Sequence, residues 1–160
     1  MVTAYLSLGS NIEPRVHLSK AIQELRSQFG SLCPSPVYGS APVGFVGDPF
    51  LNLVVSFETF RPPEEIYHFL RIVESQHGRT RNDQKHSART LDIDLLLYGS
   101  AVRIEVPILP REEILRYAFV LRPLADLAPD ERHPILNIAY SDLWNAFDSS
   151  QQPLLVVEPL

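Results

Sequence analysis

Alternation of apolar and polar side chains marks three segments of the chain as β-strands. Residues 2–8, 50–59 and 91–98 follow the period of two that sends neighbouring side chains to opposite faces of a sheet. Residues 31–38 form a further predicted strand, which two prolines interrupt. In the first two segments, the apolar side chains that share one face are Val2, Ala4, Leu6 and Leu8, then Leu51, Leu53, Val55 and Phe57.

Two further segments carry apolar side chains at the spacing of an α-helix. The first begins near Pro14 and ends before Gly30, and the second begins at the Pro62-Pro63 pair. Proline suits the first helical turn because its missing N–H is not needed there, and glycine favours the position after the last turn. The side chains that these helices are expected to bury are Leu18, Ile22, Leu25 and Phe29, then Ile66, Phe69, Leu70 and Val73.

The order of these elements, β-α-β-β-α-β, is that of the ferredoxin-like fold. Beyond it the pattern predicts a short strand at 101–106, a helix near 111–116, further helical pieces to about residue 147 and an edge strand at 154–157. A length of 160 residues suits one domain. We therefore expect a single α+β domain over 1–160, a ferredoxin-like βαββαβ sandwich with C-terminal helical additions and long loops at the active site.

Composition narrows the functional classes. The formal net charge is −5, which disfavours general nucleic-acid binding because that binding depends on basic side chains against phosphates. Cys33 is the single cysteine, as expected in a reducing compartment, and no stretch approaches the ~18 apolar residues of a membrane span. We therefore expect a cytoplasmic monomer without nucleic-acid or membrane partners.

A pair of carboxylates is the sharpest chemical feature of the sequence. Asp92 and Asp94 lie two residues apart on a predicted strand, so they share one face. Two such charges about 5 Å apart repel by about 3 kcal/mol at an effective dielectric constant near 20, so a cation is expected beside them. Oxygen ligands without a histidine pair suit Mg²⁺, although two solvated aspartates explain the motif alone equally well. The side chains expected to point into the core from this strand are Ile93, Leu95 and Leu97.

A long polar loop at 75–90 precedes the two aspartates, with Ala88 as its single apolar side chain. Loops of this length inside a domain are uncommon and usually functional or mobile. Four cations minus one acid, Asp83, give it a local charge of +3, which suits a Mg²⁺–polyphosphate site because arginine forks onto phosphate oxygens. A solvated charged loop is the alternative. The four cations are Arg79, Arg81, Lys85 and Arg89.

A second group of residues follows the loop at 39–49, which is rich in glycine and proline. Phe50 and Asn52 share one face of the strand that begins there. An aromatic ring and an amide suit a flat heterocycle, because one stacks and the other pairs with a donor–acceptor edge. A core phenylalanine and a capping asparagine explain the same two residues, and from the residues alone we favour this simpler explanation.

Three blocks of sequence stand out where predicted elements end. They are LGSN at 8–11, RTLDIDLLLYG at 89–99, and FVL with PL inside 119–124. Together they resemble the 6-hydroxymethyl-7,8-dihydropterin pyrophosphokinase family of folate biosynthesis, and the resemblance runs in the expected order from residue 2 to about 134. It implies a ferredoxin-like sandwich with flexible loops. It also implies transfer of pyrophosphate from ATP to the hydroxymethyl oxygen of the pterin, with release of AMP.

The resemblance implies roles at the nucleotide end of the site. Asp92 and Asp94 would hold two Mg²⁺ ions on the triphosphate, and with Arg79 and Arg89 they would form the catalytic set. No general base is evident in the sequence. The residues implied in ATP binding are Glu74, Arg79, Arg81, Lys85, Arg89 and Arg111.

The resemblance also implies a pterin site. Phe50 and Phe119 would sandwich the ring between them. Asn52, with the backbone at Ser40 and Val43, would form hydrogen bonds to the edges of the ring.

A few positions depart from the family pattern. Arg111 replaces a common histidine and Tyr117 a common arginine, and the central block differs at His86 and Ser87. Arginine can take the place of a histidine that binds phosphate. Three alternatives remain open: a diverged paralogue acting on another pterin, a non-catalytic module of ferredoxin-like fold that binds ATP, and an RNA-binding module of this fold.

Overall fold

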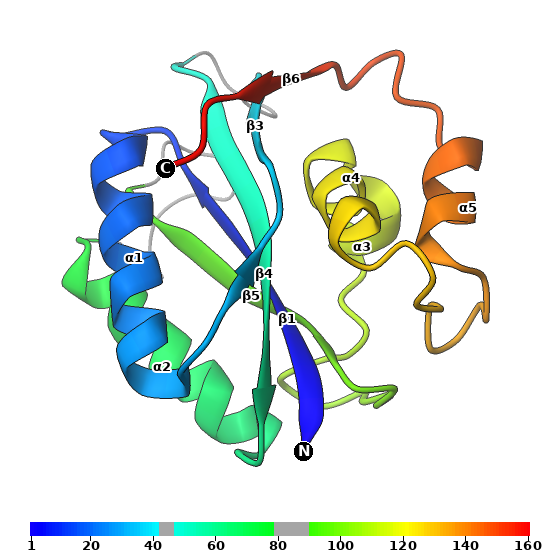
Figure 1. The fold of residues 1–160 in the computed structure, drawn as a ribbon, viewed down its shortest axis with the longest axis horizontal. Coiled ribbons are helices and arrows are strands. Elements are labelled where there is room, and N and C mark those ends of the chain that lie inside the picture. The colour runs from blue at the N-terminus through cyan, green and yellow to red at the C-terminus, as the bar shows by residue number, and fades with distance from the viewer. Residues whose placement is uncertain (42–46, 79–89) are drawn as a thin grey trace.

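One antiparallel sheet organises the computed structural model, which describes residues 1–41, 47–78 and 90–160 (Figure 1). The strands lie in the order β5-β1-β4-β3-β6, and β2 also pairs with β4, which confirms the expected ferredoxin-like arrangement. The strands are β1 (Val2–Ser10), β2 (Cys33–Pro34), β3 (Val37–Ser40), β4 (Phe50–Thr59), β5 (Asp92–Tyr98) and β6 (Leu154–Val157). The helices are α1 (Pro14–Phe29), α2 (Pro63–Gln76), α3 (Glu113–Arg116), α4 (Ala118–Leu127) and α5 (Tyr140–Ala146).

Helices cover both faces of this sheet. α1 and α2 lie on one face, and α3, α4 and α5 lie on the other (Figure 1). The alternation within β4 builds both layers, because Leu53 packs toward α1 and α2 while its neighbour Val54 packs toward α4. Both side chains are fully buried. The sheet therefore separates two hydrophobic clusters, and its residues can be assigned to a face from the cluster they join.

The alternation of side chains between the two faces of the sheet shifts in the middle of β5. Leu6 of β1 pairs with Leu95, but the preceding Tyr5 pairs with Leu97, so Leu96 is an extra residue in β5. Leu95 joins the α1–α2 cluster, whereas Leu96 and Leu97 join the α4 cluster. The expectation that Leu97 points the same way as Leu95 is therefore wrong, because the bulge shifts the alternation by one residue.

Two strand predictions also need correction. The segment 31–38 is not one strand, because β2 and β3 are separated at Ser35, whose backbone N–H donates to Val54 O at 2.8 Å. Its hydroxyl accepts a hydrogen bond from Val54 N at 2.9 Å, so the side chain helps to stabilise the interruption between β2 and β3. The segment 101–106 forms only an isolated bridge, between Arg103 and Leu109, and its side chains Val102, Ile104 and Val106 are exposed.

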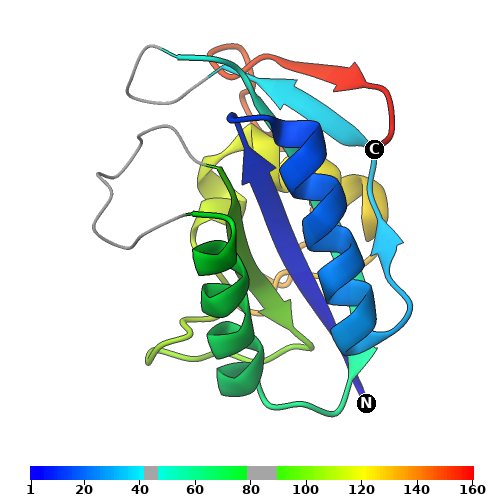
Figure 2. The same cartoon turned by 90° about the vertical axis from the view of Figure 1, so that its left-hand side faces the viewer.

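The predicted helices are found with their expected ends. α1 runs from Pro14 to Phe29 and α2 begins at Pro63, with Phe29 and Phe69 half-buried at the edge of the first cluster. The predicted edge strand is β6, which pairs with β3 at the border of the sheet (Figure 2). In the part of the chain that the structure describes, no helix is long and apolar enough to cross a bilayer.

Candidate functional site

Four neighbouring strands place one residue each in a line across one end of the sheet. Tyr38 of β3 pairs with Asn52 of β4, Asn52 pairs with Gly9 of β1, and Gly9 pairs with Asp92 of β5. Residues paired across antiparallel strands share a face, and here it is the face that α4 covers. We call Tyr38, Asn52, Gly9 and Asp92 the site row. It joins two groups of residues that the sequence singled out separately.

Gly9 leaves space in the middle of the site row. A Cβ atom at this position would lie 2.9 Å from Asn52 Oδ1, closer than two such atoms can approach. The amide of Asn52 is held there, because its Nδ2 donates to Ser40 Oγ at 2.7 Å and both residues are buried. The glycine of the LGSN block therefore lets an oriented amide lie beside the backbone of β1.

The remainder of the LGSN block fixes the turn after β1. Ser10 Oγ donates to Ile12 O at 3.1 Å, and Asn11 Nδ2 donates to Asp48 O at 3.1 Å. The second bond joins this turn to the chain just before β4. Both residues are buried, so the block holds the end of the sheet that carries the site row.

Two aromatic side chains lie on the same side of the sheet as the site row. Phe50 is half-buried on β4, two residues before Asn52, and it pairs with Ser40 of β3. Phe119 is half-buried on α4, within the cluster that packs on this face, and its ring stacks on Tyr117 at 5.0 Å between centroids. The structure thus brings Ser40, Phe50 and Asn52 together and places Phe119 in the layer that covers them.

The two aspartates share a face, as the sequence predicts. Asp92 pairs with Gly9 and Asp94 with Ser7, while the intervening Ile93 is fully buried on the opposite side. Both carboxylates are half-buried rather than fully solvated. Partial burial makes their mutual repulsion stronger than it would be in water, so compensating cations are required.

Two arginines supply part of this compensation. Asp94 Oδ1 lies 3.4 Å from Arg71 Nη2 and 3.5 Å from Arg111 Nη2. Arg111 Nε also lies 2.9 Å from Glu113 Oε2. Burial lowers the pKa of Arg111, but Asp94 and Glu113 raise it more, so the guanidinium stays charged. Arg111, which the family resemblance implies in ATP binding, therefore lies beside the Asp94 carboxylate.

Glu74 holds the backbone between the two aspartates. Its Oε2 accepts a hydrogen bond from Ile93 N at 2.9 Å, and its Oε1 lies 3.1 Å from Arg71 Nε. Burial raises the pKa of Glu74 to about 8, an effect that Arg71 opposes and Asp92 reinforces. The family resemblance implies a role for Glu74, whereas Arg71 was not among the residues singled out from the sequence. Their spacing of three puts both side chains on one face of α2, but it does not show that this face meets β5.

The donor set fits a hard divalent cation. Asp92 and Asp94 offer carboxylate oxygens from one face, and Arg71 and Arg111 lie beside Asp94. Within residues 1–41, 47–78 and 90–160, no three His, Cys, Asp or Glu side chains converge into a complete cage. Mg²⁺ suits such a partial set, because it is usually bound through one or two carboxylates and completes its shell with water and phosphate oxygens.

Some predicted site residues lie outside the described parts of the chain. These residues are Val43, Arg79, Arg81, Lys85 and Arg89, and their predicted roles stay untested.

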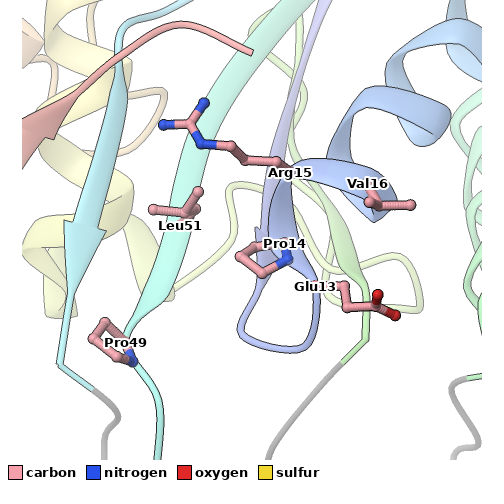
Figure 3. A pocket seen from close by; sticks show the side chains of 6 residues that line it. All are labelled: Glu13, Pro14, Arg15, Val16, Pro49 and Leu51. Atoms are coloured by element: carbon pink, nitrogen blue, oxygen red, sulfur yellow. The ribbon is translucent and has the colours of Figure 1, made fainter.

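A pocket of about 470 Å³ lies elsewhere, between the start of α1 and the start of β4 (Figure 3). Leu51 lines it from the face that packs toward α1, opposite to the face of Asn52. It is therefore separate from the site row and its carboxylates. The lining residues are Glu13, Pro14, Arg15, Val16, Pro49 and Leu51.

Comparison with known sequences gives a consistent match. Residues 5–129 match the family model described as 7,8-dihydro-6-hydroxymethylpterin-pyrophosphokinase. The chain is 39% identical over 136 residues to the 2-amino-4-hydroxy-6-hydroxymethyldihydropteridine pyrophosphokinase of Pseudomonas aeruginosa, covering 81% of this chain and 83% of the relative. The enzyme of the same name from Porphyromonas gingivalis is 37% identical over 136 residues, with 81% and 92% covered.

Solved structures match in fold. The HPPK-DHPS of Plasmodium falciparum superposes with a TM-score of 0.73 at 14% identity, covering 90% of this chain and 45% of that protein. This chain thus spans less than half of that longer protein. At this identity the likeness supports the ferredoxin-like fold alone.

Proposed function

The chain belongs to the 7,8-dihydro-6-hydroxymethylpterin-pyrophosphokinase family, and we propose that Asn52 and Asp92, on either side of Gly9 in the site row, mark a pterin end and a nucleotide end of the site for its reaction. That reaction transfers a pyrophosphoryl group from ATP to the hydroxymethyl group of the dihydropterin for folate synthesis, and it leaves AMP. The observation that supports the division is the pairing of Asn52, Gly9 and Asp92 across adjacent strands. Asn52 and Asp92 lie on either side of Gly9, which supports a pterin site at the amide and a nucleotide site at the carboxylates.

The nucleotide end consists of the two aspartates and Arg111. Asp92 and Asp94 would hold two Mg²⁺ ions, which when bound neutralise charge on the triphosphate. Arg111 Nη2 lies 3.5 Å from Asp94 Oδ1, and the guanidinium keeps its charge. Its remaining N–H donors can therefore bind phosphate oxygens beside the two aspartates. Glu74, Arg79, Arg81, Lys85 and Arg89 complete the proposed ATP site.

The pterin end consists of Asn52 and its neighbours. The bond from Asn52 Nδ2 to Ser40 Oγ fixes the amide before the substrate arrives, so little ordering is left to do on binding. Phe50 and Phe119 would stack on the two faces of the ring, and the backbone at Ser40 and Val43 would bind its edges. Such positioning, with charge neutralisation at the phosphates, is the main source of rate enhancement in phosphoryl transfer.

Finer assignments also belong to this proposal. We propose that the enzyme acts as a cytoplasmic monomer, without nucleic-acid or membrane partners, and that residues 1–160 fold as one domain. The net charge of −5 supports the exclusion of general nucleic-acid binding.

The nucleotide product tests the proposed function. The enzyme is incubated with Mg²⁺, ATP labelled in the β-phosphate and 6-hydroxymethyl-7,8-dihydropterin. We expect AMP and pterin pyrophosphate in equal amounts, with the label on the pterin, and no product when Mg²⁺ is chelated. Formation of ADP, or absence of turnover with this pterin but not with an analogue, would contradict the assignment.

A further inference from the structure

Side chains of α2 form hydrogen bonds to the backbone at the outer edge of β5. β5 lies at one border of the sheet, so its outward backbone groups have no strand partner among the described residues. At Ile93 both groups are nevertheless bonded. The N–H donates to Glu74 Oε2 at 2.9 Å, and the carbonyl accepts from Arg71 Nη2 at 2.5 Å.

These two side chains form one unit. Arg71 Nε lies 3.1 Å from Glu74 Oε1, and the two residues are separated by one turn of α2. Glu74 is 2% exposed and Arg71 is 19% exposed. The guanidinium also lies over the ring of Tyr67, at 4.9 Å from its centroid. Arg71 is therefore restrained at once by the carboxyl group of Glu74, an aromatic face and a backbone carbonyl.

The residue that this unit holds is the one between the two aspartates. Ile93 is fully buried, and the carboxylates of Asp92 and Asp94 project from its two neighbours to the other face. Any shift of the Ile93 backbone would change the separation and direction of both carboxylates. A metal site tolerates little displacement of its ligands, so the supporting contacts affect metal affinity directly.

We propose that Arg71, acting with Glu74, is a positioning residue for the two metal-binding aspartates, a role that rests on the proposed function. Its shortest contact is to the Ile93 carbonyl, at 2.5 Å, whereas Asp94 Oδ1 lies 3.4 Å away. Holding the backbone of β5 is therefore its main task, and neutralising Asp94 is secondary.

The competing explanation predicts the opposite change in metal affinity when Arg71 is removed. If Arg71 served only as a counter-charge to Asp94, its removal would free a carboxylate and tighten metal binding. If it positions the strand, its removal weakens metal binding although a positive charge has been lost. Lysine separates the two roles further, because it keeps the charge but lacks the planar fork that serves Glu74 and the Ile93 carbonyl together.

The test compares Arg71→Met and Arg71→Lys with wild type and with Arg26→Met, which removes an exposed arginine of α1. The first readout is amide hydrogen exchange at Ile93, with Val55 inside β4 as the internal reference. The second is the dissociation constant of Mn²⁺, measured by electron paramagnetic resonance with a non-hydrolysable ATP analogue. The third is the half-saturating Mg²⁺ concentration in the reaction, compared with the KM for the pterin.

Both Arg71 variants should exchange the Ile93 amide about 10-fold faster and bind Mn²⁺ about 10-fold more weakly, as expected for one lost charge-assisted hydrogen bond. The KM for the pterin should change less than about twofold, and Arg26→Met should behave as wild type. If Arg71→Met does not fold, Arg71→Lys still decides the question.

Unchanged or tighter Mn²⁺ binding, or a lysine variant equal to wild type, would overturn the proposal. A wild-type protein that binds Mn²⁺ and nucleotide but makes no AMP would refute the proposed function. In that case the exchange and Mn²⁺ measurements would still decide the role of Arg71.

Discussion

At Gly9 the structure leaves no room for a methyl group. We expect Gly9→Ala to push the Asn52 amide off its position, because the new Cβ would lie 2.9 Å from Oδ1. The KM for the pterin should rise by about 10-fold, equivalent to about 1.4 kcal/mol of binding free energy. Steady-state kinetics with varied pterin measures this. Gly39→Ala is the control, since its Cβ would meet Val157 at an ordinary 3.6 Å. An equal effect of both substitutions would contradict the argument.

Asp94→Asn tests the metal assignment at a single atom. The amide keeps the shape of the carboxylate but not its charge, so turnover that depends on Mg²⁺ should fall by at least about 100-fold. Folding should persist with a slightly lower melting temperature, because Arg71 and Arg111 lose a partner charge. Melting curves and AMP formation are measured on the same sample. Retained activity would exclude Asp94 as a ligand.

Single residues differ in how far the sequence reveals them. The period of two is enough to put Asp92 and Asp94 on one face, and Phe50 with Asn52 on the same side. It cannot reveal Arg71, because the partner of this side chain is a backbone carbonyl on a strand 22 positions away. Contacts from a helix to a strand edge depend on how the two elements pack, which no local pattern encodes.

At the scale of elements, polar side-chain contacts hold α4 against β3. The hydroxyl of Tyr38 donates to Asp126 Oδ2, and it accepts from Arg122 Nε at 3.2 Å. Arg122 also lies over the ring of Trp144, so α5 joins the same group. Because α4 carries Phe119, these contacts set the position of a proposed pterin-stacking ring.

Tyr38→Phe should therefore affect both stability and substrate binding. Loss of the buried hydroxyl should lower the free energy of unfolding by about 1–2 kcal/mol and raise the KM for the pterin. Urea unfolding and kinetics measure the two effects. Tyr98→Phe is the matched control, because it removes a hydroxyl bonded to Arg61 O at 2.8 Å, far along the sheet from the site row. It should lose stability without changing that KM.

Element boundaries were predictable where the pattern was unambiguous. Alternation located β4 from Phe50 to Thr59, and proline with glycine located the ends of α1. The bulge in β5 was not predictable, because Leu95, Leu96 and Leu97 are all apolar. The sequence therefore does not show which side of the sheet each of them faces. The prediction of a strand at 101–106 is wrong, because alternating apolar residues also occur in an exposed segment that pairs only at Arg103.

At the scale of the whole molecule, the buried His133 and the half-buried His17 make the fold sensitive to acid. Burial lowers the pKa of His133, whose Nδ1 accepts from Ile135 N at 3.2 Å and Leu136 N at 3.1 Å, and so must be unprotonated. Burial also lowers the pKa of His17, helped by His77, whose Nδ1 lies 2.7 Å away. Both residues favour the neutral form in the folded state.

At these two histidines the unfolded chain therefore binds more protons than the folded one just below the ordinary histidine pKa of 6.5. The two histidines should lower the free energy of unfolding as the pH falls through 6.5 toward their lowered folded-state pKa values. Glu74 acts in the opposite direction up to about pH 8, because burial raises its pKa to about 8. Urea midpoints between pH 8 and pH 5 measure this. His133→Gln should flatten the dependence, whereas His68→Gln on the exposed side of α2 should not. A steep dependence that survives in the first variant would contradict this cause.

The pairing of β6 with β3 has a practical consequence. Arg15 donates to the carbonyls of Glu158 and Pro159, so the chain after β6 is tied back to the start of α1. A linker or affinity tag that pulls there would strain the border strand next to Ser40. Met1 is 70% exposed at the other end of the sheet, so surface immobilisation for biosensor work should use that terminus.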